Sequence, residues 1–473
     1  GSLSAQSAGS NYSRQVNTLI GTKGVGLTSG YLYPGATYPY GMVQFTPSYF
    51  SKRSGFVINQ LSGGGCEHMG NFPTFPVKGK LKMSPDNILN YRINISEEKG
   101  HAGYYEAMVQ EDIKAKLTVT ERTGMASYEY PADQQYGTVI IGGGISATPI
   151  EQAAIVITAP NKCEGYAEGG YFCGIRTPYK VYFVAEFDTD ALETGTWKRN
   201  ELKPNTSFAE GEYSGVYFTF DVSKKKNVQY KIGVSYVSVE NARENLKAEN
   251  TGWDFAQIQS QAEAKWNHYL SKIEVEGTNP DRTTQFYTHL YRSFIHPNVC
   301  SDVNGEYMGA DFRVHKSRSK HYTSFSNWDT YRTQIQLLAM LDPEVASDIV
   351  ISHQLFAEQS GGSFPRWVMA NIETGVMQGD PTPILISNAY AFGARNYDPR
   401  PIFKIMRKGA EEPGSKSQNE ETRPGLRQYL DKGYYNASAQ LEYTSADFAI
   451  GQFALHAVGD EFSSWRYFHF ARS

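Results

Sequence analysis

The sequence is poor in cysteine, with only four in 473 residues. Four are too few for the disulfide framework of a small secreted domain, and their spacing matches no zinc-binding pattern. Cys163 and Cys173 flank a glycine-rich turn, so these two are the candidates for a hairpin disulfide in an oxidising compartment. Cys66 and Cys300 are predicted to be single thiols. The sequence leaves the pairing of Cys163 and Cys173 open.

Long apolar runs are also missing. No run approaches the roughly 20 residues that a membrane-spanning helix needs, so we expect no membrane span. The opening residues lack the pattern of a signal peptide, so we expect residues 1–10 to be a mature N-terminus or a cloning remnant.

An excess of one charge is lacking as well. The chain has 45 Lys and Arg against 49 Asp and Glu, a net charge of -4, and these charges are spread along its length. No basic stripe is present that would bind a phosphate backbone, so nucleic acid is not an expected partner.

Aromatic residues, by contrast, make up 14% of the chain, and 33 of them are tyrosines. A tyrosine combines an apolar ring face with a hydroxyl, which suits both solvent-facing strands and sugar-binding surfaces. Composition alone leaves both interpretations open. The length favours two or more domains with a large buried core.

The first half of the chain has the alternating pattern of half-buried strands. Residues 113–120 alternate apolar and polar side chains, and residues 181–187, 216–220 and 230–237 repeat this theme between turn-rich segments. Many such strands in series predict an N-terminal antiparallel β-sandwich domain over residues 11–240.

Near residue 240 the spacing of apolar residues changes from the period of strands to that of helices. Residues 241–280 are predicted to form a helical linker, and residues 281–473 are predicted to be helical. The predicted helices cover residues 281–295, 328–341, 343–358, 382–395, 400–409, 439–457 and 460 onward.

A sandwich followed by paired helices predicts a multidomain β + α protein whose second domain is an incomplete (α/α)6 toroid. A closed toroid needs twelve helices, and residues 281–473 supply only its first half. Because an open half-ring would expose apolar helix faces to water, we expect polypeptide to follow Ser473.

Several motifs occur in order along the chain. The N-terminal ones are glycine- and proline-rich turns at residues 16–22, 33–47 and 62–71. The later ones are SNWDTYR at 326–332, GGSFPRW at 361–367, NIETGVMQGD at 371–380 and LEY at 441–443. Together they resemble glycoside hydrolase family 92, the calcium-dependent inverting exo-α-mannosidases of bacteria, over nearly the whole chain.

Trp328 and Asp329 have the chemistry that a pyranose site requires. A sugar ring offers hydroxyl pairs to carboxylates and a C–H face to an aromatic plate, and these two residues supply both groups. The resemblance favours sugar contact. The alternative is that Asp329 caps a helix and Trp328 is part of the core.

Polar residues of the following loop are further candidates for substrate binding, because a loop between apolar helices can bring them together on a ligand. They are Trp367, Asn371, Glu373 and Asp380. Alternatively, Asn371 and Glu373 satisfy backbone amides of the loop. Arg332 and Arg366 are candidates either for ligand contact or for structural ion pairs.

Glu67 and His68 lie in a glycine-flanked loop of the predicted sandwich. A lone Glu-His pair does not define a metal or acid-base site. The family resemblance implies instead a specificity loop at the leaving-group subsite.

The resemblance implies inverting hydrolysis of terminal α-linked mannose, as found in N-glycans, with a Ca²⁺ ion on the sugar hydroxyls O2 and O3. Inversion needs an acid and a base roughly 6.5–9.5 Å apart. The family's Glu-Gly-Asn acid motif and Gly-Asn-Glu/Asp-Asp base and calcium motif do not occur before Ser473. Asn436, Glu442 and Asp447 are not marked as substitutes by their spacing, so the catalytic pair and the calcium ligands are expected beyond Ser473.

Mannose-containing glycans are the expected partners, and the α-mannosidic linkage is left open. We expect a secreted or periplasmic protein, with outer-surface attachment as one option, that is a monomer if the full chain is present. One alternative is a non-catalytic fragment that binds glycans weakly. Another is a different sandwich-plus-toroid enzyme such as a glycoside phosphorylase, although no cluster suited to phosphate is evident.

Overall fold

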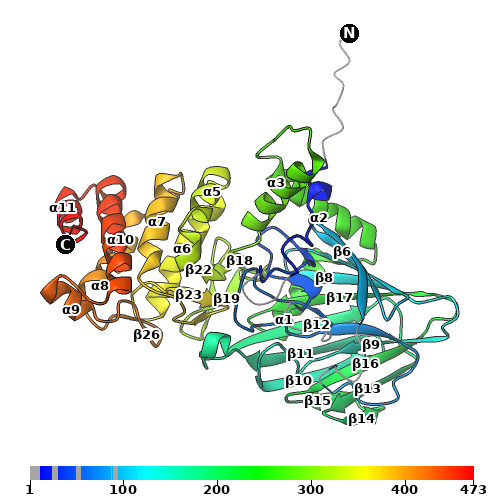
Figure 1. Cartoon of the computed structure of the whole chain (residues 1–473). Helices are drawn as coiled ribbons and strands as arrows, with labels where there is room; N and C mark the ends of the chain where they lie inside the picture. Colours follow the sequence, from blue (N-terminus) through cyan, green and yellow to red (C-terminus); the bar gives the residue numbers. More distant parts are fainter. Residues whose placement is uncertain (1–10, 24–29, 49–54, 87, 89–93, 473) are drawn as a thin grey trace. The chain divides into compact units, whose positions relative to one another are not determined.

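The computed structural model describes residues 11–23, 30–48, 55–86, 88 and 94–472. The chain divides into two compact units (Figure 1). The first unit contains Gly1–Gly169, Val181–Val234 and Ala242–Ile295, and the second contains Gly170–Lys180, Ser235–Asn241 and His296–Ser473. None of the helices in the described ranges is long and apolar enough to cross a membrane.

The first unit is a β-sandwich of two sheets with antiparallel registers, which confirms the predicted fold class. In order across the eight-stranded sheet lie β1 (Ala36–Thr37), β2 (Gln44–Pro47), β3 (Phe56–Val57), β4 (Thr74–Lys78), β9 (Tyr136–Ile141), β16 (Ser214–Asp221), β13 (Glu193–Lys198) and β14 (Glu201–Pro204). The nine-stranded sheet runs β15 (Phe208–Glu210), β10 (Ile150–Ala159), β11 (Lys162–Gly169), β12 (Tyr179–Phe187), β17 (Asn227–Ser235), β8 (Thr123–Glu129), β7 (Ile113–Val119), β6 (Tyr104–Val109) and β5 (Ile95–His101).

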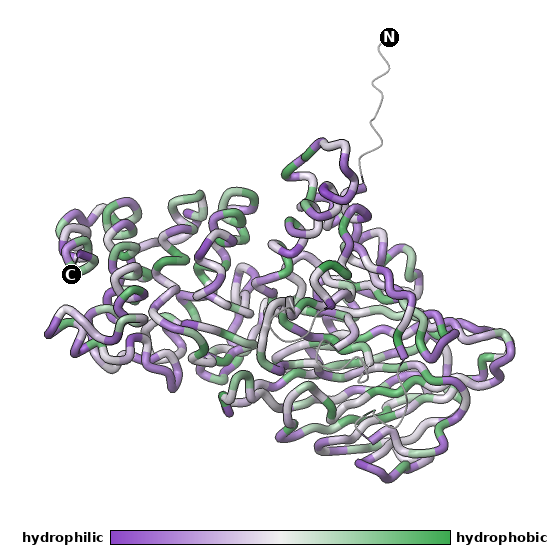
Figure 2. Tube along the Cα trace, in the orientation of Figure 1, coloured by the Kyte–Doolittle hydropathy of each residue, from purple (hydrophilic) through white to green (hydrophobic). Residues whose placement is uncertain are grey.

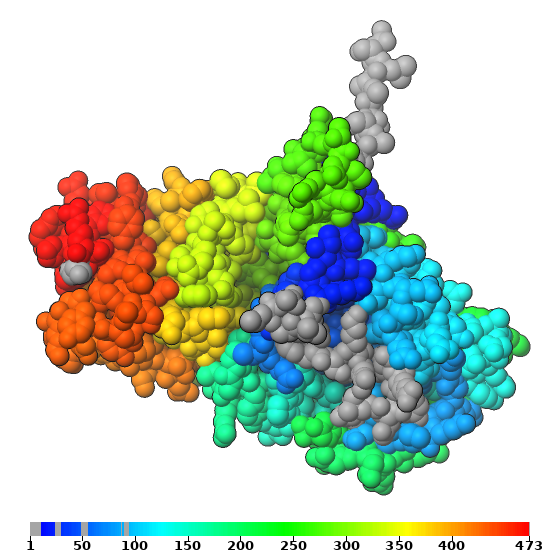
Figure 3. All heavy atoms as spheres, viewed as in Figure 1, coloured from blue at the N-terminus to red at the C-terminus, as the bar shows by residue number. Residues whose placement is uncertain are grey.

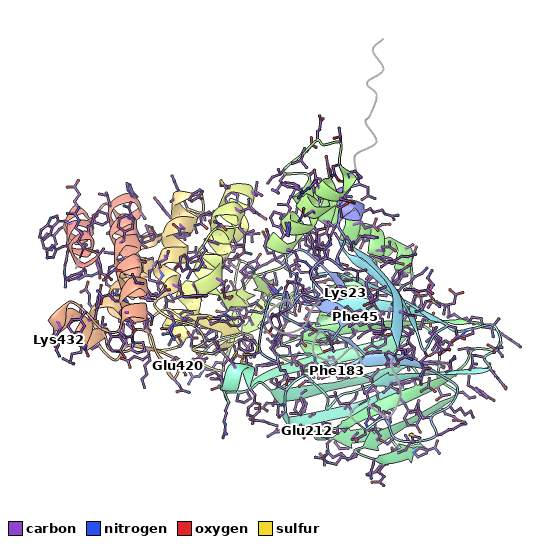
Figure 4. All side chains as sticks on the ribbon, in the orientation of Figure 1. Lys23, Phe45, Phe183, Glu212, Glu420 and Lys432 are labelled. Carbon is purple, nitrogen blue, oxygen red and sulfur yellow. The ribbon has the colours of Figure 1, made fainter. Side chains whose placement is uncertain are left out.

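Alternation of side chains explains why these segments form a sandwich. Along β7, Ile113, Ala115 and Leu117 are buried while the lysines between them are partly exposed, and Figure 2 shows the same alternation of hydropathy along other strands. Phe45 and Phe183, labelled in Figure 4, belong to the aromatic core. Each large apolar side chain removed from water stabilises the fold by about 1.5–3 kcal/mol.

Three helices complete this region: α1 (Val239–Glu249), α2 (Phe255–Leu270) and α3 (Pro280–Ser293). Asp254 and Asn279 cap α2 and α3 by accepting hydrogen bonds from backbone amides of the first turn. Trp266 of α2 is buried and donates its indole N–H to the carbonyl of Thr37 at 2.8 Å. Most of the stretch predicted as a linker therefore packs within the first unit.

The second unit is mainly helical. It contains α4 (Asn327–Thr330), α5 (Gln334–Leu341), α6 (Pro343–Gln359), α7 (Pro381–Ala391), α8 (Pro399–Glu411), α9 (Leu426–Lys432), α10 (Ala437–Phe453), a π-helical turn (Ala454–Val458) and α11 (Glu461–Phe470). Prolines at the first position of α6, α7 and α8 fix where these helices begin. Helix α7 packs against both α5 and α10, and side chains fill the space between the helices (Figure 3).

Short strands connect the helices at one side of this unit. They are β18 (Asn298–Val299), β19 (Glu306–Met308), β20 (Val314–Lys316), β21 (Tyr322–Thr323), β22 (Phe325–Ser326), β23 (Trp367–Met369), β24 (Ile372–Glu373), β25 (Lys416–Ser417) and β26 (Glu420–Glu421). Strands β22, β23 and β24 form a small sheet that leads directly into α4. This sheet places the 326–332 motif beside the 361–367 motif.

The disulfide state of the cysteines differs from the pairing that the sequence suggested. Cys163 is a free thiol buried on β11, so a Cys163–Cys173 hairpin disulfide is wrong. Burial raises the pKa of the Cys163 thiol, which keeps it protonated. Cys66 and Cys173 are the disulfide-bonded cysteines, so the prediction of a single thiol is wrong for Cys66. It is confirmed for Cys300, which is free and buried.

Candidate functional site

Trp328, Arg332 and Glu442 form one cluster in the second unit. The indole N–H of Trp328 donates to Glu442 Oε1 at 2.9 Å, and Arg332 Nη2 lies 3.8 Å from the same oxygen. The Arg332 guanidinium lies 4.5 Å from the centre of the Trp328 ring, a cation–π contact. We call these three residues the Trp328 cluster.

The backbone brings α10 unusually close to the loop before α7 at this point. A Cβ atom on Gly379 would lie 2.5 Å from the Cβ of Glu442, and Gly379 has φ +77°. Only glycine fits both the left-handed conformation and the close approach. The glycine of the 371–380 motif thus allows Glu442 to reach Trp328.

Asp329 is exposed next to this cluster, and its carboxylate accepts a hydrogen bond from the Ser326 hydroxyl. Trp328 is partly exposed, so it is not a core residue. Oε2 of Glu442 is buried and has no hydrogen-bond partner. An unpaired buried acceptor is costly unless a ligand or water fills the position, which marks this cluster as a candidate binding site.

Glu373 lies in the adjacent loop and is occupied by backbone groups. Its carboxylate accepts from the amides of Arg366, Trp367 at 3.1 Å and Gly375 at 2.8 Å. Burial raises the pKa of Glu373, while the amide donors oppose that shift. Its contacts in the structure are those of a residue that shapes the loop.

Arg366 also binds the loops around it. Its guanidinium donates to the carbonyls of Gly379 at 2.8 Å, Gly375 at 3.0 Å, Thr422 at 3.1 Å and Glu421 at 3.2 Å. Figure 4 labels Glu420 in this region, on β26. These four carbonyl acceptors satisfy the hydrogen-bonding capacity that Arg366 shows here, so its position needs no ligand to explain it.

Trp367 and Asn371 are both buried. The Trp367 ring packs on Phe172 with 4.7 Å between ring centres, and Asn371 Nδ2 donates to the Gly309 carbonyl at 3.1 Å. The cavity bordered by Arg366, Glu373 and Asp380 has a volume of about 10 Å³, enough for one water and too small for a sugar ring.

Asp380 takes part in a buried ionic network that the sequence did not reveal. Arg423 is only 1% exposed, and its Nε and Nη1 donate to Asp380 and Asp447, each at 2.8 Å. The Tyr429 hydroxyl donates to the second Asp447 oxygen at 2.8 Å. Burial alone would lower the pKa of Arg423, but the two carboxylates outweigh it and raise the pKa. This network joins the start of α7 to α9 and α10.

One sequence signal pointed toward this network. Asp447 interrupts an apolar stretch of α10 between Ala446 and Ile450, and an acid in such a position needs a buried partner. Arg423, Tyr429 and the role of Glu442 had no local signal.

Glu67 and His68 belong to the first unit. His68 is 1% exposed; its Nε2 accepts from the Leu61 amide at 2.8 Å and its Nδ1 donates to the Cys66 carbonyl at 2.7 Å. Burial lowers the pKa of His68 to about 4, so the ring is neutral at pH 7. Glu67 is exposed. Their suggested role at a leaving-group subsite stays a prediction.

A calcium site is not evident from the side chains in the described ranges. No group of three or more His, Cys, Asp or Glu residues there is arranged to hold a metal ion. Among the buried carboxylates, Glu373 accepts from backbone amides, Asp380 from Arg423, and Asp447 from Arg423 and Tyr429. The calcium ion stays a prediction.

Comparisons with known proteins agree on one family. Residues 15–235 match the family model "Glycosyl hydrolase family 92 N-terminal domain", and residues 241–472 match "Glycosyl hydrolase family 92 catalytic domain". A protein of Arthroderma benhamiae described as "Uncharacterized secreted glycosidase" is 26% identical over 363 residues, which is 68% of this chain and 45% of that protein.

Solved structures give the same match. The family GH92 α-mannosidase BT3965 from Bacteroides thetaiotaomicron is 25% identical, with a TM-score of 0.86 over 98% of this chain and 64% of that chain. It has also been solved in complex with mannoimidazole. The family GH92 inverting mannosidase BT2199 from the same species has a TM-score of 0.87 at 24% identity, over 97% of this chain and 64% of that one. The chain thus spans less than two thirds of the length of these relatives.

Proposed function

The chain belongs to glycoside hydrolase family 92, and from this premise we propose that the protein is an exo-α-mannosidase that releases terminal α-linked mannose from glycans such as N-glycans. The name of the 25% identical relative, an α-mannosidase, supports this substrate class. Its complex with mannoimidazole supports mannose-containing glycans as partners.

The observation that carries the proposal is the Trp328 cluster with exposed Asp329 beside it. Asp329 and the unpaired Oε2 of Glu442 are acceptors for sugar hydroxyls, and Trp328 is an aromatic surface for the C–H face of a pyranose. Because Arg332 covers one face of the Trp328 ring, the sugar would use the opposite face.

The buried residues of the motifs act as positioning residues in this proposal. Glu373 and Arg366 hold the loop before α7, and Arg423 fixes Asp380 and Asp447. A binding site held by rigid surroundings loses less entropy when the ligand binds. We therefore assign the buried residues to pocket shape and the Trp328 cluster with Asp329 to sugar contact.

Inversion and calcium assistance are the finer parts of the proposal, and they rest on the resemblance of the chain to this family. We assign no acid, base or calcium ligand among the described residues. We also propose that the protein is secreted, in line with the name of the relative from Arthroderma benhamiae.

Mannose release from α-1,2-, α-1,3- and α-1,6-mannobiose tests this proposal. We expect release from at least one linkage, loss of activity in EDTA, and β-mannose as the first anomer seen by proton NMR. Asp329→Asn should lower activity, whereas Asp431→Asn, on the exposed surface of α9, should not. If mannose is released from none of the three substrates, the proposal is contradicted. Release of α-mannose first would contradict inversion alone.

A further inference from the structure

The first unit contains a cavity of about 620 Å³ at one edge of the sandwich. Its walls come from both sheets: β10, β11 and the edge strand β15 on one side, and β13 and the edge strand β14 on the other. Figure 1 shows these strands together at the lower end of the first unit. The volume lies within the range of about 300–1,000 Å³ typical of small-molecule sites. We call it the sandwich-edge pocket.

A β-bulge directs two polar side chains to this pocket. The register of β10 against β11 shifts between Ile150 and Gln152, so Glu151 is the extra residue. In a regular strand Glu151 and Gln152 would point to opposite faces, but here both are exposed and both line the pocket. Bulges commonly re-aim side chains in this way beside binding sites.

Aromatic rings lie on the same strands. Phe208 is 54% exposed on β15 and lines the pocket wall. Tyr166 on β11 and Glu210 on β15 are both register partners of Ala154, so they share one face across three strands.

The opposite wall is held firmly. Trp197 is fully buried and donates its indole N–H to the Asp86 carbonyl at 2.8 Å. Lys198 Nζ donates to the carbonyls of Glu210 at 2.8 Å and Glu212 at 3.0 Å, which fixes the end of β15. A preformed wall lowers the entropy that a ligand loses on binding.

The charges of the pocket are balanced. Two glutamates, Glu151 and Glu210, and two lysines, Lys198 and Lys203, line the pocket, and the ammonium group of Lys198 is already bound by two carbonyls. A polyanion or a cation would therefore meet a like charge in the pocket. The exposed Phe208 ring, the partly exposed Tyr166 ring, the carboxylates and an amide suit a neutral ligand that has both hydroxyl groups and a C–H face.

We propose that the sandwich-edge pocket binds a neutral oligosaccharide, with a sugar ring on Phe208 and hydroxyl groups on Glu151, Gln152 and Glu210. It shares no residue with the Trp328 cluster, and its proposed role is to hold the glycan without cleaving it. The proposal stands apart from the proposed hydrolysis, because binding here requires no catalytic residue.

Affinity electrophoresis of the full chain in gels that contain α-mannan, dextran or polygalacturonate tests this site. We expect retardation in at least one of the neutral polymers, and binding about tenfold weaker in Phe208→Ala, the order of effect seen when an anchoring aromatic is truncated. Phe312→Ala, a phenylalanine of the second unit that is 53% exposed, is the matched control and should bind as the parent does. Tyr166→Ala is a second variant, and thermal melting checks that each variant is folded.

Three outcomes would overturn the proposal. If neutral polymers retard Phe208→Ala and Tyr166→Ala as much as the parent protein, the binding site lies elsewhere. If retardation is lost only in Trp328→Ala, the binding site is the Trp328 cluster. Retardation in polygalacturonate alone, or in no polymer, would exclude a neutral glycan ligand. Mannose release can fail while retardation persists, so the two proposals are tested separately.

Discussion

Trp328 and Glu442 are 114 residues apart in the sequence, and the indole N–H of the first donates to a carboxylate oxygen of the second at 2.9 Å. This bond joins α4 to α10 at the place where Asp329 is exposed. The same carboxylate attracts Arg332, which lies over the Trp328 ring. Glu442 therefore sets the orientation of the aromatic surface proposed to bind mannose.

Glu442→Ala should weaken substrate binding by releasing Trp328 and Arg332. A hydrogen bond to a charged group is worth about 1.5–3 kcal/mol, so we expect KM for the cleaved mannobiose to rise about tenfold or more. Glu442→Gln keeps an acceptor for Trp328 and should restore most of the affinity. Steady-state kinetics separates KM from kcat, and Glu412→Ala, an exposed residue at the end of α8, is the control. An unchanged KM in Glu442→Ala would contradict this role.

Arg423→Met should destabilise the second unit strongly, because Asp380 and Asp447 would remain buried without their partner. Breaking such a pair costs about 3–5 kcal/mol. Calorimetric unfolding should show a lower Tm, and adding Asp380→Asn and Asp447→Asn should recover part of the loss. Arg400→Met removes an exposed partner of Asp398 and should leave the Tm unchanged. Equal Tm values for Arg423→Met and Arg400→Met would contradict the structural importance of the network.

His353 should make stability depend on pH. Burial lowers its pKa from 6.5 to about 4, and the hydrogen bond that Nδ1 donates to the Ile349 carbonyl at 2.8 Å opposes that shift only in part. Nε2 of the neutral ring accepts from Asn327 at 3.0 Å. Between pH 4 and pH 6.5, His353 therefore binds a proton more readily in the unfolded chain than in the folded protein. The stability contributed by the neutral ring is complete above pH 6.5 and is lost as the pH falls toward 4, on the order of 2 kcal/mol by pH 5.

Urea unfolding at pH 7 and pH 5 measures this effect. The difference in the free energy of unfolding between the two pH values should shrink in His353→Gln. His289→Gln, an exposed histidine of α3, should show the parent's pH dependence. Equal pH dependence in all three proteins would show that His353 is not the group that titrates.

The fold was predictable because its signals are local. Alternation in residues 113–120 predicted β7, and prolines preceded by aspartate mark the starts of α6, α7 and α8. Helix α9 was not predicted, since Leu426–Lys432 has only seven residues between two glycines. So short a helix depends on tertiary packing rather than on its own sequence.

The candidate site was predictable only in part. The 326–332 motif placed Trp328, Asp329 and Arg332 together because they share one short segment. The partners of Arg423 lie 43 and 24 residues away, so no local pattern links them. Glu373 shows a further limit: its carboxylate accepts backbone amides, the alternative that the sequence could not separate from ligand contact.

The cysteines allow a chemical test of the fold. Cys163 was a candidate for pairing because it and Cys173 flank a glycine-rich turn, but its side chain is buried in the sandwich core, where burial raises the pKa of its thiol. We therefore expect no alkylation of the native protein by iodoacetamide. Intact mass should show two alkylated thiols after denaturation without reductant, Cys163 and Cys300, and four after reduction. Peptide mapping that finds Cys173 alkylated before reduction, or Cys163 protected, would contradict the disulfide assignment.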